Sequence, residues 1–160
     1  NYINWNNANK NAESMYNTDK MKSDLLTTTQ AKIVDYWLEK AGFNVASDSS
    51  TWGNYSNVDK EINGLASSDF GKDYKETSGK FGGNIINATG TIEKNKSNNI
   101  YDWAGNLWEY TDTPYEQTEY YISHGGYYGT SGNISPASFT NSFTGEASSK
   151  VGFRICLNML

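Results

Sequence analysis

The fold is decided by residues 99–111, which read NIYDWAGNLWEYT. Gly105 stands in the middle of this stretch and permits a backbone conformation that a Cβ atom closes to other residues. Trp103 and Trp108 supply large apolar rings, each with one N–H that needs an acceptor when buried. Asp102 and Glu109 are carboxylates among these rings, where burial is costly unless they are paired or bound to a metal. The stretch therefore predicts a tight turn among buried rings, with two acidic side chains in need of partners.

Short strands are predicted on either side of this turn. Residues 100–111, 120–128 and 151–160 are rich in Tyr, Trp, Phe, Ile and Val, and glycines interrupt them. This composition is typical of short β-strands. Residues 56–98 are instead polar and rich in Gly, Ser and Asn, so we expect a long loop there. A few apolar residues would anchor the loop or mark short strands at its end: Phe70, Tyr74, Phe81, Ile85, Ile86 and Ile92.

Helical periodicity is confined to the first quarter of the chain. A short amphipathic helix is predicted with one face made of Trp5, Ala8, Ala12, Met15 and Tyr16. A second helix is predicted over residues 28–41, with a core-facing stripe made of Ile33, Val34, Trp37, Leu38 and Ala41. Thr27 or Thr28 can cap its start, and Gly42 can end it in a left-handed conformation. The fold class is therefore α+β.

Composition narrows the class of protein. The 160 residues are 36% hydrophobic with a mean hydropathy of -0.72, but 14% are aromatic and the net charge is only -5. A globular chain with a core of large rings fits these values better than a disordered one. A pI near 4.8 argues against nucleic acid, and no run of about 18 apolar residues exists for membrane insertion. We expect residues 1–160 to form one domain, the C-terminal part of a longer protein of low-GC bacterial or phage origin.

The chain has one cysteine and one histidine, Cys156 and His124. A single cysteine cannot form an internal disulfide. We interpret Cys156 as a buried free thiol, because it lies in an apolar run. The alternative, weakly indicated, is a Cys/His nucleophile pair.

Three fragments, in order, resemble the formylglycine-generating-enzyme or sulfatase-modifying family. They are the DWAGNLWEY segment, His124-Gly125-Gly126 followed by two rings, and the closing Val151-Gly152-Phe153-Arg154. Residues 4–8 and 23–38 are similar to the family's first two helices. This family is a loop-rich variant of the C-type lectin fold. The resemblance therefore implies two N-terminal helices and a loop-rich, mostly antiparallel sheet.

The resemblance also implies a calcium site. Its ligands would be the side chains of Asp102 and Glu109 and the backbone carbonyls of Gly105 and Leu107, since calcium prefers oxygen ligands. Alternatively, Glu109 pairs with a lysine or arginine or accepts backbone N–H groups, with no metal. Arg154, the only arginine, is expected to be structural, because its planar fork can satisfy a buried carboxylate or several carbonyls.

The family's oxidase chemistry requires two cysteines that bind copper(I) and attack a substrate thiol. At the matching positions this chain has Thr130 and Ser135. We therefore expect no copper and no enzymatic activity. An enzyme with altered chemistry is the alternative.

Residues 119–150 are the expected recognition segment. They are rich in Tyr, Ser, Gly, Asn and Thr and nearly free of charge, a mixture that paratopes also use. The expected contact residues are Tyr128, Thr130, Ser131, Asn133, Phe139, Thr140 and Asn141, with Trp52 and Trp108 as weaker candidates for lining a groove. The expected partner is a protein or glycan receptor on a cell surface, bound by an extracellular, virion-tail or bacterial-surface protein. An ordinary polar loop, or a structural decoration domain without a ligand, would also fit.

Lectin-fold proteins that retroelements diversify are similar to this family and vary residues just before a C-terminal GFR. Adenine-directed mutation of Asn codons would produce a set of residues that this segment contains: His124, Tyr127, Tyr128, Thr130, Ser131, Asn133, Ser138, Phe139 and Asn141. Unmutated low-GC loops have the same composition, so both retroelement diversification and an ordinary loop are consistent with the sequence.

Overall fold

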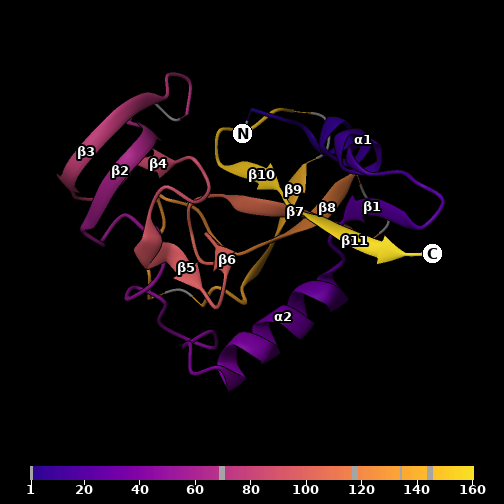
Figure 1. Cartoon of the computed structure of the whole chain (residues 1–160), viewed down its shortest axis with the longest axis horizontal. Helices are drawn as coiled ribbons and strands as arrows, with labels where there is room; N and C mark the ends of the chain where they lie inside the picture. The colour runs from indigo at the N-terminus through magenta and orange to yellow at the C-terminus, as the bar shows by residue number, and fades with distance from the viewer. Residues whose placement is uncertain (1, 69–70, 117–118, 134, 144–145) are drawn as a thin grey trace.

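The computed structural model describes residues 2–68, 71–116, 119–133, 135–143 and 146–160. Figure 1 shows the β2–β3 hairpin at one end of the molecule, α1 with β1 and β11 at the other, and α2 along one side. In chain order the elements are α1 (Trp5–Met15), β1 (Met21–Leu25), α2 (Thr28–Lys40), β2 (Lys60–Ser67), β3 (Lys75–Phe81), β4 (Ile86–Asn87), η1 (Glu93–Asn95), β5 (Lys96–Ser97), β6 (Ile100–Tyr101), β7 (Trp108–Pro114), β8 (Tyr120–His124), β9 (Phe139–Phe143), β10 (Val151–Phe153) and β11 (Ile155–Met159). No helix within these residues has the length and apolar character needed to cross a membrane.

A four-stranded sheet in the order β10-β7-β8-β9 forms the centre of the fold. The β7–β8 and β8–β9 pairs are antiparallel, whereas β10 runs parallel to β7 and pairs Gly152 with Glu109. The hairpin belongs to a β3-β2-β4 sheet, and β1–β11 and β5–β6 are antiparallel pairs. The predicted α+β class with a mostly antiparallel sheet is confirmed. Pairing of β10 with β7 brings the GFR segment beside the WEY segment.

Helix α1 begins and packs as predicted. The Asn4 side chain caps it by accepting the N–H of Asn7 at 2.9 Å. Its buried face consists of Trp5, Ala8 and Ala12. The Trp5 ring stacks on another ring, that of Tyr121, with centroids 3.5 Å apart.

The expected end of that face was wrong. Met15 and Tyr16 are 54% and 47% exposed. The helix ends at Met15, and Tyr16 is already extended with a φ of -140°. Its backbone N–H donates to the Ser23 hydroxyl at 2.9 Å, which ties the chain to β1 and leaves the ring outside.

Helix α2 has the predicted caps but a different buried face. Thr27 forms a capping box with Gln30, and Gly42 follows the helix with a φ of +93°. The buried positions are Ala31, Asp35 and Leu38. Of the predicted stripe, only Leu38 is buried and Val34 half-buried, whereas Ile33, Trp37 and Ala41 are exposed. The prediction counted apolar residues only, and the helix is turned so that a carboxylate faces the core.

The predicted loop over residues 56–98 contains a regular hairpin, so that part of the prediction was wrong. Strands β2 and β3 pair antiparallel from Lys60↔Phe81 to Ala66↔Lys75. Ile62 and Ala66 face inward and pack with Ile85 and Ile92. The remaining strand residues are mostly polar, so the segment does not read as a strand in sequence. Of the expected anchors, Ile86 lies in β4, and Phe70 lies outside the described residues.

Cys156 is half-buried and free, with its Sγ 3.6 Å from the carbonyl oxygens of Asp24 and Leu25. His124 directs Nε2 to Asp35, and its Nδ1 has no hydrogen-bond partner among the described residues. The structure therefore does not contain the Cys/His pair that was the weaker alternative.

Candidate functional site

The turn predicted around Gly105 depends on left-handed backbone conformations. Asp102, Gly105 and Asn106 have φ values of 54°, 73° and 62°. A Cβ atom on Gly105 would overlap the backbone oxygen of Asn54, so only glycine fits. Asn106 N–H donates to that same oxygen at 2.9 Å, and Gly105 N–H donates to Gly125 at 3.1 Å. The turn is thus fixed to two segments that are distant in sequence.

Behind the turn, buried amides connect a lysine to a carboxylate. The Lys60 ammonium donates to Asn54 Oδ1 and, at 3.1 Å, to the Tyr55 carbonyl. Asn54 Nδ2 donates to Asn87 Oδ1 at 2.6 Å, and Asn87 Nδ2 donates to Asp102 Oδ1 at 3.3 Å. We call Lys60, Asn54, Asn87 and Asp102 the amide bridge. Its dipoles run head to tail from cation to anion, an order in which each hydrogen bond strengthens the next.

Burial changes the acid–base properties of both ends of the amide bridge. Lys60 is 2% exposed, and burial lowers its pKa to about 8. Asp102 is 4% exposed, and burial raises its pKa, opposed by the N–H donors of Asn95, Asn87 and Gly90. Among the residues that the structure describes, neither Lys60 nor Asp102 forms an ion pair. The amide oxygen of Asn54 accepts from the Lys60 ammonium, and the amide nitrogen of Asn87 donates to the Asp102 carboxylate.

Glu109 is paired with Arg154. The Arg154 Nε lies 3.1 and 3.0 Å from the two Glu109 oxygens, and Nη2 donates to Oε1 at 2.7 Å. Nη2 also donates to the Tyr101 carbonyl at 3.0 Å, and the guanidinium lies 5.4 Å from the centre of the Trp103 ring. This is the arginine pairing that the sequence left open as the alternative to a metal, and it accords with a structural role for Arg154.

The donor set does not fit the calcium ion that the resemblance implies. Both Glu109 oxygens accept N–H groups of Arg154, and Asp102 accepts N–H groups of Asn87, Asn95 and Gly90. A cation bound between these carboxylates, beside the carbonyls of Gly105 and Leu107, would meet hydrogen-bond donors. Across the described ranges no group of three His, Cys, Asp or Glu side chains could hold a metal. Calcium binding is untested, and the hydrogen bonds of these two carboxylates argue against it.

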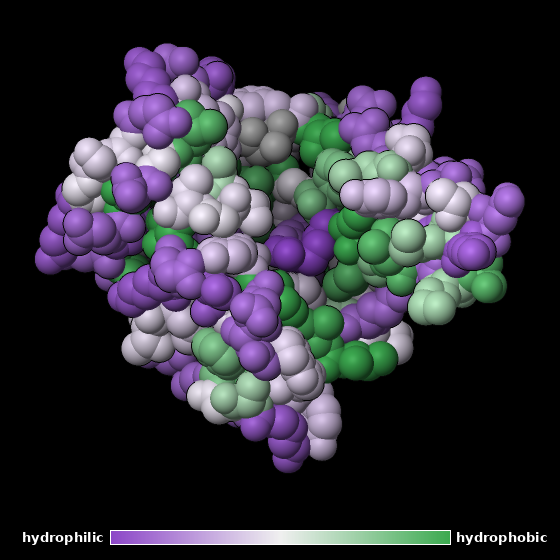
Figure 2. Space-filling model, in the orientation of Figure 1, coloured by the Kyte–Doolittle hydropathy of each residue, from purple (hydrophilic) through white to green (hydrophobic). Residues whose placement is uncertain are grey.

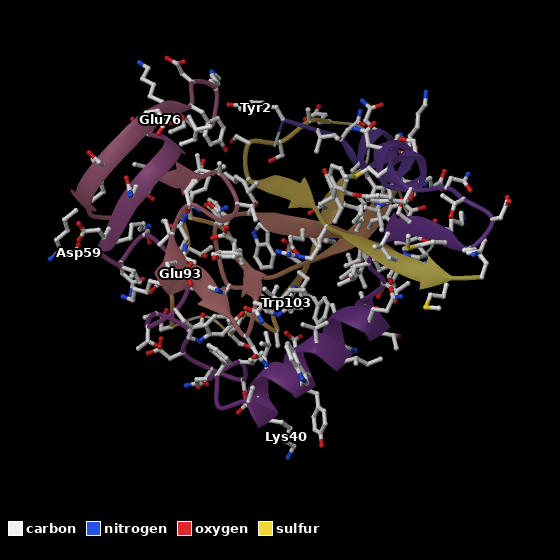
Figure 3. The ribbon with its side chains drawn as sticks, in the orientation of Figure 1. Tyr2, Lys40, Asp59, Glu76, Glu93 and Trp103 are labelled. Atoms are coloured by element: carbon white, nitrogen blue, oxygen red, sulfur yellow. The ribbon has the colours of Figure 1, made fainter. Side chains whose placement is uncertain are left out.

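Asp35 is a buried polar residue that was not predicted from the sequence. Its Oδ1 accepts the indole N–H of Trp103 at 2.8 Å, and its Oδ2 lies 3.1 Å from His124 Nε2. Figure 3 shows Trp103 in the interior, whereas Asp59 and Glu76 point outward from the hairpin. The signal was present: Asp35 follows Ala31 by four positions and precedes Leu38 by three, so it shares their face of α2.

The two hydroxyls at the family's cysteine positions are used in hydrogen bonds to the backbone. Thr130 Oγ1 donates to the Tyr127 carbonyl at 2.8 Å, and Ser135 Oγ donates to the Val45 carbonyl at 2.7 Å. Both side chains are half-buried.

The expected contact residues form two groups. Thr130, Ser131 and Asn133 lie in the loop after β8, and Asn133 is exposed. The earlier 45–57 loop holds this loop: the N–H of Ser56 donates to the Thr130 carbonyl at 2.8 Å. The N–H of Gly132 donates to Asn57 Oδ1, also at 2.8 Å.

The second group is Phe139, Thr140 and Asn141 on β9, an edge strand of the central sheet. With Tyr115 and Ile122 these residues line a pocket of about 270 Å³.

Two of the expected site residues, Tyr128 and Trp52, are buried, and Trp108 is half-buried. Tyr128 is 2% exposed, so we leave it out of the contact set. Trp52 is 6% exposed in the core cluster with Trp103, whereas Trp108 packs on the cluster around Trp5. The two tryptophans therefore belong to different clusters rather than to one groove.

A cavity of about 510 Å³ that the sequence did not indicate opens over the 102–109 turn. It lies between the β2–β3 hairpin and β10, where Figure 2 shows this face of the molecule hollowed near its middle. Asp102, Asn106 and Glu109 supply polar groups to its lining, and Leu65, Tyr74 and Phe153 supply apolar surface. Strand pairing and the amide bridge bring these six residues together from segments distant in sequence.

This fold and motif set define a domain of the sulfatase-modifying class. The family described as sulfatase-modifying factor enzyme 1-like domain matches residues 3–159, and the chain belongs to it. Among solved structures, "Crystal Structure of CarF" is similar, with a TM-score of 0.57 and 17% identity. The similarity covers 87% of this chain and 48% of that one, so this chain spans about half the length of CarF. At this identity the likeness shows the fold alone. No curated protein matches the chain.

Proposed function

We propose that this domain is a non-catalytic module that binds a protein or glycan receptor, as part of a phage tail, prophage or bacterial surface protein. The observation that carries the proposal is the chemistry of Thr130 and Ser135. Copper(I) binding and thiol oxidation both require thiolates, and a hydroxyl group cannot carry out either. Both hydroxyls donate to backbone carbonyls, which gives them a structural role instead.

The preorganisation of the contact loop supports a binding role. Hydrogen bonds from Ser56 and Gly132 hold the loop in one conformation, so less ordering entropy is lost when a partner binds. Asn133 and Asn141 are exposed and can adapt their hydrogen bonds, and Phe139 offers part of a rigid ring. These are the properties that a recognition surface combines.

Retroelement diversification of this surface is part of the same proposal. Asn133 and Asn141 are accessible, whereas His124 and Tyr128 are buried and would not alter recognition directly. A template repeat and a reverse transcriptase gene beside the coding region are the observations that test it.

Arrays of glycans and surface proteins, probed with the purified chain, test the binding function. The variant Asn133→Ala with Asn141→Ala should lose the array signal at least tenfold, by an order-of-magnitude expectation for removing central contacts. Asn6→Ala with Asn63→Ala removes two exposed asparagines elsewhere and should retain the signal. If wild type binds nothing on either array, or oxidises a peptide cysteine to an aldehyde, the proposal is wrong.

A further inference from the structure

We propose that the cavity over the 102–109 turn is a second binding site, and that it binds a neutral saccharide of one or two rings by direct contact, without a metal. This site is distinct from the contact loop and β9, so it can be tested independently of the receptor surface proposed above.

The size and walls of the cavity suit such a ligand. Its volume of about 510 Å³ is within the range of roughly 300–1,000 Å³ that small-molecule sites occupy. The apolar part of its lining, which we call the apolar wall, consists of Leu65, Tyr74 and Phe153 and can pack against the C–H face of a sugar ring. The polar part of the lining, which we call the polar wall, carries two carboxylates and the amide of Asn106.

The polar wall has unused capacity to accept hydrogen bonds. Within the described part of the chain, the contacts of Asp102 Oδ2 are long: 3.4 Å from the backbone nitrogen of Gly90 and 3.5 Å from the side-chain nitrogen of Asn87. Glu109 Oε2 accepts one N–H, from Arg154 at 3.0 Å. Each carboxylate oxygen can accept two hydrogen bonds, and a hydroxyl donating to a carboxylate forms one of the stronger kinds. A ligand rich in hydroxyl groups would use both oxygens.

The charges around the cavity favour a neutral ligand. An anion would be repelled by Asp102, whose buried side chain has only N–H donors as partners. An organic cation would be attracted to Asp102 but repelled by the nearby Arg154 guanidinium, which lies 2.7 Å from the cavity-lining Glu109. A saccharide brings donors to the carboxylates without adding a charge of either sign.

The polar wall is also fixed before any ligand arrives. Asn106 Oδ1 accepts from Asn54 at 2.9 Å and from the Asn87 N–H at 3.1 Å, and its Nδ2 donates to the Asn87 carbonyl at 3.0 Å. Asn106 and Asn87 are 3% and 2% exposed. A ligand therefore does not have to order these side chains, which reduces the free-energy cost of binding.

Saturation-transfer NMR and calorimetry on the whole chain in EGTA test the site. The probes are methyl glycosides of glucose, galactose and mannose, N-acetylglucosamine, and the disaccharides maltose, cellobiose and lactose. At least one probe should bind with a Kd of about 1 mM or tighter, which corresponds to a modest free energy of binding.

Thr89→Trp and Leu65→Lys test the location of binding. Thr89 is exposed at the cavity and Leu65 is 41% exposed, so neither change disturbs the core. Each should weaken binding about tenfold or more by filling the cavity or charging its apolar wall. Thr29→Trp on exposed α2 surface is the matched control.

Three results would overturn the site: no probe binds wild type, binding survives in both cavity variants, or binding requires added calcium. The Asn133→Ala, Asn141→Ala variant should bind saccharide as wild type does while losing its array signal. That difference separates a failure of this site from a failure of the receptor surface.

Discussion

Replacing Asp35 by alanine should destabilise the domain by about 3 kcal/mol. The carboxylate is the acceptor for the indole N–H of Trp103 and for Nε2 of His124, side chains that are 2% and 1% exposed. Without it, two buried donors lose their partner, and each such loss costs about 1–3 kcal/mol. Relief from burying the carboxylate, and the better helix propensity of alanine by about 0.5 kcal/mol, offset part of this. Asp35→Asn retains an acceptor for Trp103, so it should cost about half as much.

Urea denaturation followed by circular dichroism gives the free energy of unfolding for each variant. Ile33→Ala is the matched control, because Ile33 lies on the same helix and is 62% exposed. Its free energy of unfolding should stay within about 0.5 kcal/mol of wild type, as for most surface substitutions. If Asp35→Ala matches the Ile33→Ala control, or is more stable than Asp35→Asn, then the buried hydrogen bonds do not hold α2 as described.

Three further predictions concern the turn and its charges. Gly105→Ala should unfold the domain or lower its stability in thermal melts by more than about 3 kcal/mol, because the new Cβ would overlap backbone atoms. Gly42→Ala is the control: nothing lies within 4 Å of its Cβ, so it should lower stability by only about 1 kcal/mol. Equal losses of stability would contradict the close approach at Gly105. Because the pKa of Lys60 falls from 10.5 to about 8 on folding, the unfolded state binds more protons between these values, so stability should rise as pH rises through that window. Lys60→Met should lack this rise, so the wild-type-minus-variant difference in the free energy of unfolding, from urea titrations, should increase with pH across the window. A difference that does not change with pH would argue against a buried ammonium. Excess calcium or EGTA should leave the wild-type Tm unchanged within about 1 °C, because Arg154 already pairs with Glu109. A ligand that binds the native state raises the Tm, so a calcium-dependent rise would show that calcium binds after all.

Much of the fold follows from local signals in the sequence. A threonine cap before α2, the left-handed Gly42 and the Gly-punctuated aromatic strands were all predictable, because each depends on neighbours in the chain. The hairpin was not readable. Its strands bury few apolar side chains, such as Ile62 and Ala66, and lack the β-branched and aromatic runs on which strand prediction relies.

The site was predicted only in part, for a similar reason. Asp102 and Glu109 were identified as carboxylates in need of partners, and Arg154 as a residue able to supply one. The remaining partners, including Asn54 and Asn87, are amides in segments that resemble ordinary loops. Tertiary structure alone brings residues 54, 60, 87 and 102 together, and no spacing in the sequence predicts their contact.

Because each amide of the bridge accepts on one side and donates on the other, none can rotate alone. A reversed Asn54 would point its amino group at the Lys60 ammonium and its oxygen at the oxygen of Asn87. The four segments that carry these residues therefore fit together in a single arrangement, in which each residue of the bridge faces its own partner. This directionality distinguishes the native conformation from alternatives in which one of these segments is shifted.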